Sequence, residues 1–344
     1  MYNFKNDYSE GCHPAIIDAI IKTNDSQQEG YGDDDFSIEA KNFIRKKLNN
    51  LKSEIYFISG GTHANLTVIA AALRPHESVV CCNVGHINVH ETGAIEATGH
   101  KINIIHSIDG KIRPSEIQAV IDEHNVIPHM VKPKLVYISN STEIGTIYKK
   151  QELQDLSAYC KSKGLFLFMD GARLGSALCA KDNDLDISDL AILTDVFYIG
   201  GTKNGALLGE AIVINNEALK EDFGFHLKQR GALMAKGRVL GIQFAELFRN
   251  DLFFQLATHA NTMAMKMADA LKERGFSFLT QSTTNQIFPI LPNKLIAELS
   301  KKYGFYIWQK MDENHSAIRL VTSWATKEEV IAQFVKDIES IKIE

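Results

Sequence analysis

The sequence has no apolar run of the ~18–20 residues that a helix needs to cross a bilayer. Its first ten residues are polar and include Asp7 and Glu10, so they do not resemble a secretory signal. The formal charge of -5 is mild for 344 residues, and it offers neither the basic surface that binds nucleic acid nor the polybasic segment that binds anionic membranes. We therefore expect a cytoplasmic protein that binds neither nucleic acid nor a membrane.

Cysteine is also scarce, with five residues, an odd number. Cys81 and Cys82 are adjacent, and no pair of cysteines has the spacing of a metal ribbon. His86 and His90 have a spacing that can bind zinc on a helix, but no third ligand is evident. Reduced cytosolic thiols and no metal site are the expectation.

What the sequence does contain is an alternation of short apolar runs and helical stretches. The runs expected to form strands cover residues 53–59, 78–82, 134–138, 165–169, 196–199 and 211–214. Helices are predicted at 63–73 and at 151–163, the second ending at Gly164. This alternation predicts an α/β fold with a mostly parallel sheet covered by helices.

The length predicts two domains, at roughly 100–200 residues for each. The strand and helix alternation places the large domain at residues 11–245. A long helical stretch over 236–274 follows, and then come apolar runs at 286–291 and 317–321 and a helix at 327–341. These predict a smaller C-terminal α+β domain, residues 246–344, joined by the N-terminal segment 1–10.

A glycine turn follows the first of three predicted strands that end next to residues able to bind a ligand or take part in catalysis. Ligands gather beyond the carboxyl ends of strands in open α/β sheets. Gly60, Gly61 and Thr62 lead from a strand into a helix, where backbone N–H groups and the helix dipole favour a phosphate. An ordinary tight turn would explain them equally well. The segment is neither a Walker sequence nor a dinucleotide fingerprint, which disfavours a nicotinamide dehydrogenase.

An acid and a lysine follow two later strands. Asp170 ends the apolar run 165–169, where an ionised carboxylate needs a cation such as a protonated pyridine nitrogen. An arginine ion pair or a helix cap is the simpler alternative. Lys203 lies among glycines after the run 196–199, where nearby cations would make its amine nucleophilic, although a surface turn fits as well. A phosphate turn, an acid and a lysine in this order are what a pyridoxal-phosphate (PLP) enzyme needs.

With these residues, the chain resembles the threonine aldolase and β-eliminating lyase family of fold-type I PLP enzymes over nearly its whole length. The matching segments are Tyr31-Gly32-Asp33-Asp34, Ser59-Gly60-Gly61-Thr62-His63-Ala64-Asn65, His86 with Glu91 and Gly93, Asp170-Gly171-Ala172-Arg173, Gly201-Thr202-Lys203-Asn204-Gly205 and Arg319-Leu320-Val321-Thr322-Ser323. The resemblance implies a large domain like that of aspartate aminotransferase. It also implies an amino acid substrate and a homodimer or homotetramer with shared active sites.

The resemblance also implies roles for individual residues. Lys203 would form the Schiff base with PLP, Asp170 would hold the ring nitrogen and His86 would stack on the ring. The phosphate would be bound by Gly60, Gly61 and Thr62, with help from Lys228 of a neighbouring subunit. The substrate carboxylate would be held by Arg173, which also contacts the cofactor, by Arg319, and to a lesser degree by Asn6.

Two departures from the family pattern leave questions open. Many members carry a histidine near the substrate hydroxyl, where this chain has Glu143, so Glu143, His86 or a water are all candidates for the base. An arginine-rich segment of some relatives is altered here to Lys228-Gln229-Arg230-Gly231. The implied reaction is retro-aldol cleavage of L-threonine, L-allo-threonine or a related β-hydroxy-α-amino acid to glycine and an aldehyde. β-Elimination, transamination and a PLP-binding scaffold without turnover are the alternatives.

Overall fold

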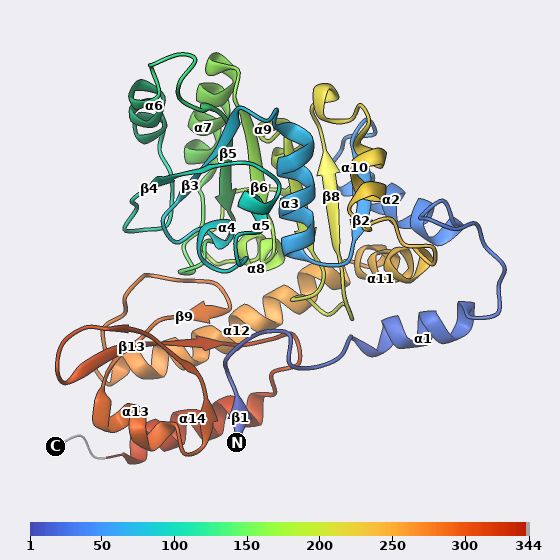
Figure 1. Ribbon diagram of the computed structural model, residues 1–344. Helices are drawn as coiled ribbons and strands as arrows, with labels where there is room; N and C mark the ends of the chain where they lie inside the picture. The colour runs from blue at the N-terminus through green and yellow to red at the C-terminus, as the bar shows by residue number, and fades with distance from the viewer. Residues whose placement is uncertain (342–344) are drawn as a thin grey trace.

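The computed structural model describes residues 1–341, so the last three residues of the predicted C-terminal domain lie outside the described part. Within that range the largest sheet has seven strands, shown in the upper half of Figure 1. In spatial order they are β2 (Glu54–Ile58), β8 (Glu210–Ile214), β7 (Val196–Gly200), β6 (Phe166–Asp170), β5 (Lys132–Ser139), β3 (Glu77–Cys82) and β4 (Ile102–Ile105). Only β8 among these seven runs in the opposite direction to the other six, which confirms the predicted mostly parallel α/β sheet.

Helices cover both faces of this sheet because its strands are apolar on both faces. One core includes residues of α1 (Pro14–Thr23), α2 (Asp35–Lys47), α6 (Pro114–Glu123), α7 (Lys150–Lys163), α8 (Leu174–Leu178), α9 (Ile187–Leu193) and α11 (Arg238–Arg249). The core on the other face includes residues of α3 (Gly61–Ala72), α4 (His86–Val89), α5 (Ala94–Ala97), the 3-10 helix Glu217–Leu219 and α10 (Phe223–Gln229). In β6, Leu167 and Met169 belong to the first core and Phe168 to the second, as the alternation of strand side chains requires.

The predicted helices agree with the observed ones except in one place. α7 ends at Gly164, which has the left-handed φ of 63°. The single helical stretch predicted over 236–274 is wrong, because α11 ends at Arg249 and α12 (Leu252–Glu273) starts after a break. Asp251, in that break, has a φ of 58°, which a continuous right-handed helix does not allow. None of the helices within residues 1–341 has the length and apolarity to span a membrane.

A smaller group of elements lies below the large sheet in Figure 1. Its sheet contains β10 (Ile290–Pro292), β13 (His315–Val321) and β12 (Tyr306–Lys310) in that order, with β9 (Gln286–Ile287) also paired to β13. The helices that pack on it are α12, α13 (Asn293–Leu299) and α14 (Glu328–Ser340). The apolar run at 286–291 therefore contains strand β9 and the start of strand β10.

The N-terminal segment packs on this smaller region and not on the large sheet. β1 (Tyr2–Asn3) pairs in parallel with β11 (Tyr303–Gly304), and Phe4 is fully buried in the same hydrophobic core as Phe334 of α14. Figure 1 shows the N-terminus beside α13 and α14. These contacts bring the first residues of the chain next to the last third of the sequence.

Helix α12 contributes to the cores of both regions. Phe253 and Leu256, near its start, pack with the large sheet, while Met263 and Met267 pack with the smaller one. The boundary predicted at 245/246 falls inside α11, whose Leu247 still belongs to the core of the large sheet. We propose that the two domains meet within α12 and that residues 1–10 belong to the smaller one.

Candidate active site

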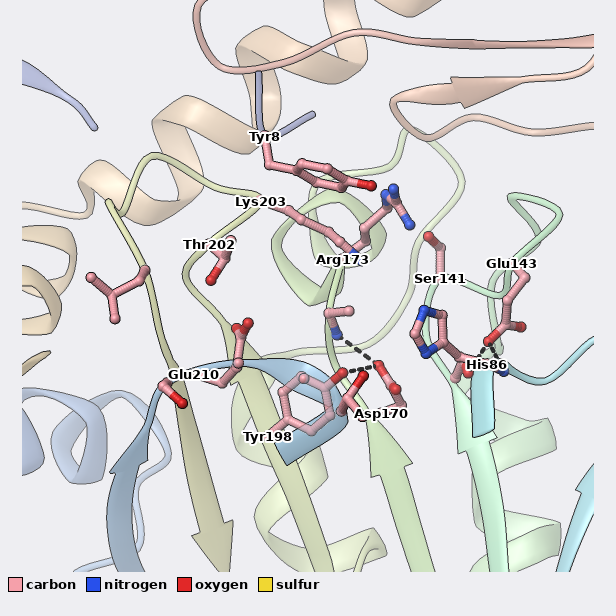
Figure 2. A pocket seen from close by; sticks show the side chains of 17 residues that line it. Tyr8, His86, Ser141, Glu143, Asp170, Arg173, Tyr198, Thr202, Lys203 and Glu210 are labelled. Carbon is pink, nitrogen blue, oxygen red and sulfur yellow. Dashed lines mark hydrogen bonds between the residues drawn. The ribbon is translucent and has the colours of Figure 1, made fainter. Parts of the chain in front are cut away.

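A cavity of about 330 Å³ lies at the carboxyl edge of the large sheet, and Figure 2 shows the residues around it. It is lined by the segments that follow β2, β3, β5, β6 and β7, by the start of β8 and by Tyr8 of the N-terminal segment. Eight of the predicted site residues meet there: Gly60, Gly61, Thr62, His86, Glu143, Asp170, Arg173 and Lys203. Asn6, Lys228 and Arg319 are not among the lining residues.

Asp170, at the end of β6, is buried and accepts four hydrogen bonds. Its Oδ1 accepts from the hydroxyl of Tyr198 at 2.5 Å and from the backbone N–H of Ala172 at 2.9 Å. Its Oδ2 accepts from the hydroxyl of Tyr137 at 2.5 Å and from Nδ2 of Asn65 at 3.1 Å. Among the described residues no lysine or arginine forms an ion pair with it, so the arginine alternative does not apply.

The surroundings of Asp170 keep its carboxyl ionised. Burial by itself raises the pKa of Asp170, but the nearby His86 and the two tyrosine hydroxyls outweigh burial and hold that pKa below its usual value. A carboxylate at a cavity wall, balanced by hydrogen bonds rather than by a resident lysine or arginine, suits a cation that enters the cavity.

Lys203 lies in the loop after β7 and reaches into the same cavity. Burial lowers the pKa of its amine, and the nearby Arg173 lowers it further, although Asp7 opposes both. No hydrogen bond or ion pair joins this amine to another residue in the range 1–341. A lysine with a lowered pKa is unprotonated, and so nucleophilic, at a pH nearer neutrality.

The glycine turn opens the first turn of α3 toward the cavity. Gly60 is the N-cap of α3, and no side chain caps the helix there. A Cβ on Gly61 would lie 3.0 Å from the hydroxyl of Tyr198, so a side chain at this position would press on a residue that binds Asp170. The predicted phosphate turn thus has uncapped backbone N–H groups at a cavity wall, an arrangement that favours an anion.

His86, at the start of α4, is held from two sides. Its Nδ1 lies 2.7 Å from Oε1 of Glu91, and its backbone N–H donates to Oε1 of Glu143 at 2.9 Å. The hydroxyl of Ser139 donates to the same oxygen of Glu143 at 2.7 Å. Burial raises the pKa of Glu143, and its Oε2 is enclosed without a partner in the described structure. Glu143 therefore positions His86 by accepting a hydrogen bond from its backbone N–H.

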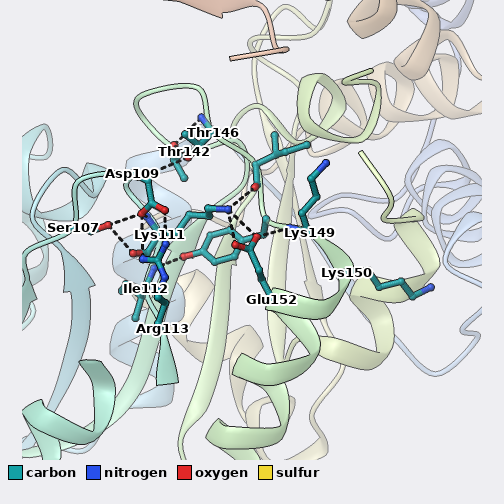
Figure 3. Close-up of polar contacts among 12 residues, drawn as sticks. Ser107, Asp109, Lys111, Ile112, Arg113, Thr142, Thr146, Lys149, Lys150 and Glu152 are labelled. Carbon is teal, nitrogen blue, oxygen red and sulfur yellow. Dashed lines mark hydrogen bonds and ion pairs between the residues drawn. The ribbon is translucent and has the colours of Figure 1, made fainter. Parts of the chain in front are cut away.

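The loop that carries Glu143 is braced from its outer side, as Figure 3 shows. The hydroxyls of Thr142 and Thr146 lie 2.7 Å apart, and the hydroxyl of Thr146 donates to the backbone oxygen of Asp109 at 2.7 Å. These bonds tie the loop after β5 to the segment after β4. They fix the loop at the cavity wall without using any group that faces the cavity.

The two arginines predicted to bind the carboxylate occupy different environments. Arg173 lines the cavity, and its Nε and Nη2 donate to Asp7 at 2.7 and 3.0 Å. Arg319 lies beyond the lining, where its Nη2 donates to the backbone oxygen of Lys5 at 3.1 Å. The guanidinium of Arg319 also lies 5.2 Å from the ring centre of Trp308.

Asn6 and Lys228 make contacts of other kinds. Oδ1 of Asn6 accepts from the backbone N–H of Tyr8 and from the hydroxyl of Ser9 at 3.0 and 2.9 Å. The amine of Lys228 lies 4.4 Å from the ring centre of Tyr31. Their roles stay predictions, and the role of Lys228 requires a second subunit.

Several residues of the site escaped prediction. Glu210, the first residue of β8, lines the cavity, and its Oε2 accepts from the backbone N–H of Gly201 at 2.9 Å. Burial raises its pKa to about 8, although Lys203 opposes this. A signal existed, because an acid beside the apolar run 211–214 resembles Asp170 beside its own run. Tyr198 gave none, since a tyrosine within an apolar strand is ordinary.

The model of a family described as β-eliminating lyase matches residues 5–293. The chain belongs to this family. A low-specificity L-threonine aldolase of Pseudomonas aeruginosa is 32% identical to it, over 98% of this chain and 97% of its own length. The solved structure of Leishmania major threonine aldolase is 48% identical, covers 98% of this chain and 99% of that chain, and has a TM-score of 0.97.

A more distant solved structure extends the comparison to the fold. A double mutant of Thermus thermophilus aspartate aminotransferase is 12% identical, covers 98% of this chain and 91% of that chain, and has a TM-score of 0.71. At such low identity the likeness concerns the fold alone. This member of the β-eliminating lyase family therefore has the predicted fold-type I architecture.

Proposed function

We propose that this chain is a PLP-dependent lyase that cleaves the Cα–Cβ bond of L-threonine, L-allo-threonine and related β-hydroxy-α-amino acids, releasing glycine and an aldehyde. The observation that carries the proposal is that Lys203, an ionised Asp170 and the open turn before α3 line one cavity. The names of the two threonine aldolase relatives, each matched over 98% of this chain, support the choice of reaction.

The cavity residues fit PLP. Asp170 stays ionised beside the cavity and would hold the protonated ring nitrogen. The uncapped backbone N–H groups around Gly61 and Thr62 would hold the phosphate. The amine of Lys203, with its lowered pKa, would hold the carbonyl carbon. When bound, the cofactor supplies an electron sink for the bond that breaks.

The protein's own groups orient the substrate. Arg173 would bind the substrate carboxylate through the part of its guanidinium that Asp7 leaves free, and Arg319 would support the same carboxylate from the smaller domain. A carboxylate fixed in this way limits rotation about the N–Cα bond of the substrate. That rotation decides which bond at Cα breaks.

A proton must leave the β-hydroxyl as Cα–Cβ breaks, and we assign it to Nε2 of His86. Glu91 occupies the other ring nitrogen, and within residues 1–341 no hydrogen bond reaches Nε2. Glu143 is less suited to this step, because its Oε1 already accepts two hydrogen bonds and its Oε2 is enclosed. His86 would keep its predicted place beside the cofactor ring.

Incubation of the purified holoenzyme with L-threonine and with L-allo-threonine tests the reaction. The expected products are glycine and acetaldehyde in equal amounts. Formation of 2-oxobutyrate in their place would show β-elimination, and conversion of the cofactor to pyridoxamine phosphate would show transamination. Either result would overturn the proposal.

We also propose a homodimer or homotetramer with active sites shared between subunits. The position of Lys228, outside the lining of the cavity in its own chain, supports this arrangement. A cytoplasmic location agrees with the five cysteines, all of which are free. Light scattering on the purified protein tests the assembly, and a fully active monomer would contradict it.

A further inference from the structure

Asp7 holds the active-site arginine Arg173 in an ion pair whose carboxylate is buried. The side chain of Asp7 is 1% exposed, and its two oxygens accept from Nε and Nη2 of Arg173 at 2.7 and 3.0 Å. Nδ2 of Asn285 donates a third hydrogen bond to Asp7 at 2.9 Å. Three donors therefore fix the orientation of the carboxylate, and the carboxylate in turn fixes the guanidinium.

The pairing decides which part of Arg173 can meet a ligand. A guanidinium is planar and offers its donors along two edges, each of which matches a carboxylate. Asp7 occupies the edge formed by Nε and Nη2. No described residue hydrogen-bonds Nη1, and Arg173 lines the cavity, so the edge formed by Nη1 and Nη2 is left for a ligand.

Asp7 is brought to the cavity by a segment anchored on the smaller domain. The backbone oxygen of Phe4 accepts from the N–H of Val321 at 2.9 Å. The backbone oxygen of Lys5 accepts from Arg319 at 3.1 Å. The ion pair of Asp7 with Arg173 therefore joins this segment to the large domain. It lies next to Arg319, the second arginine proposed to hold the carboxylate.

Charge balance also depends on Asp7. Burial by itself raises the pKa of Asp7, but Arg173 and Lys203 outweigh burial, so the carboxyl stays ionised. Without this partner the buried guanidinium would be an uncompensated cation, which is strongly unfavourable.

We propose that Asp7 is a positioning residue for substrate recognition: it holds Arg173 by one edge so that the other edge faces the carboxylate of an α-amino acid. The proposal rests on the proposed function in one respect, since it takes the ligand to be an amino acid. It implies that Asp7 governs the affinity for the carboxylate part of a ligand and leaves the affinity for its amine part unchanged.

The test compares two ligands of the holoenzyme, glycine and methylamine, which differ by the carboxylate. Binding of each is followed by the change in absorbance of the bound cofactor. Asp7→Asn keeps the size of the side chain and removes its charge, so the Kd of glycine should rise by at least about tenfold while that of methylamine stays unchanged. Glu10→Gln, in the same segment, removes a carboxylate that contacts Ser323 instead, and should change neither value.

Three results would overturn the role of Asp7: no change for glycine, equal weakening of both ligands, or tighter glycine binding, which would mean that Asp7 competes with the substrate. If Asp7→Asn does not fold, Asp7→Glu takes its place. It keeps the charge but moves the carboxylate by one methylene, and an unchanged ratio of the two Kd values would again refute the role. Selective glycine binding without threonine cleavage would sink the proposed reaction and leave the role of Asp7 standing.

Discussion

The carboxyl edge of the large sheet and the N-terminal segment meet at one cavity, but they are built in different ways. At the sheet edge, Asp170 ends β6 and Lys203 lies three residues beyond the end of β7, so the strands themselves place these groups. In the N-terminal segment, Asp7 reaches Arg173 across 166 positions of sequence, and Lys5 reaches Arg319 across 314. The first set depends on local chain geometry and the second on how distant parts of the chain pack.

This difference separates the residues proposed to hold the cofactor from those proposed to recognise the substrate carboxylate. The sheet edge supplies the groups proposed to hold the cofactor, and its strands fix them rigidly. The N-terminal segment and the smaller domain supply groups that hold the arginines. Substitutions of the cofactor-holding groups at the edge should therefore lower turnover strongly, whereas substitutions on the other side should weaken binding of the substrate carboxylate more than they lower turnover.

The largest effect is expected at the sheet edge, for Lys203→Ala. Loss of the amine should reduce multiple turnover by roughly a thousandfold or more, which corresponds to about 4 kcal/mol in the barrier. Glycine formation measures this, and borohydride reduction followed by peptide mass spectrometry should place the cofactor on Lys203 in the unmodified protein. Lys41→Ala removes another lysine whose pKa burial lowers, and should stay active. Cofactor trapped on a different lysine would contradict the assignment.

The next effect is expected for Asp170→Asn. The amide has the same shape but no charge, so it cannot keep a proton on the ring nitrogen, and kcat should fall about a hundredfold, or about 2.7 kcal/mol. Stopped-flow or steady-state assays measure kcat, and circular dichroism should show an intact fold. Asp195→Asn is the matched control, because Asp195 lies at the opposite end of the same sheet, before β7. A nearly unchanged kcat in Asp170→Asn would refute the role.

A smaller effect is expected on the recognition side, for Arg319→Lys. Lysine lacks the planar group that lies near Trp308 and donates to Lys5, so KM for threonine should rise about tenfold and kcat should fall less. Arg173→Lys should have a larger effect, because Arg173 lines the cavity. Glycine, acetaldehyde and pyridoxamine phosphate are measured together, since a looser carboxylate should let side reactions increase. Unchanged KM and product ratio in both variants would place the carboxylate elsewhere.

The last effect concerns stability rather than activity, and it also arises at the sheet edge, through Glu210. Its pKa of about 8 in the folded chain exceeds the ordinary 4.5, so between these values the folded state keeps a proton that the unfolded state has lost. The free energy of unfolding should therefore fall as pH rises, by up to about 1.4 kcal/mol per pH unit from this group. Glu210→Gln should flatten that fall in the apo-protein. Tm values from pH 5 to 8 measure it, and parallel curves for the two proteins would contradict the prediction.

Much of the fold could be predicted from local patterns. Continuous apolar runs such as 165–169 indicated strands buried on both faces, and both faces are indeed covered by helices. The break between α11 and α12 could not be predicted, because the apolar spacing continues across it and the left-handed Asp251 leaves no trace in that pattern. The pairing of β1 with β11 could not be predicted either, because a two-residue strand is too short to show an alternation of apolar and polar residues.

Local sequence patterns were enough to identify Lys203, Asp170 and the glycine turn, because each follows an apolar strand and parallel strands bring their carboxyl ends to one edge. The surroundings of these groups depend on long-range packing. Tyr198 and Tyr137 stabilise Asp170 from within apolar strands, and Asp7 takes one edge of Arg173 from the far end of the chain. A hydrogen bond depends on distance and direction in space, and neither can be read from spacing along a chain once the partners lie in different elements.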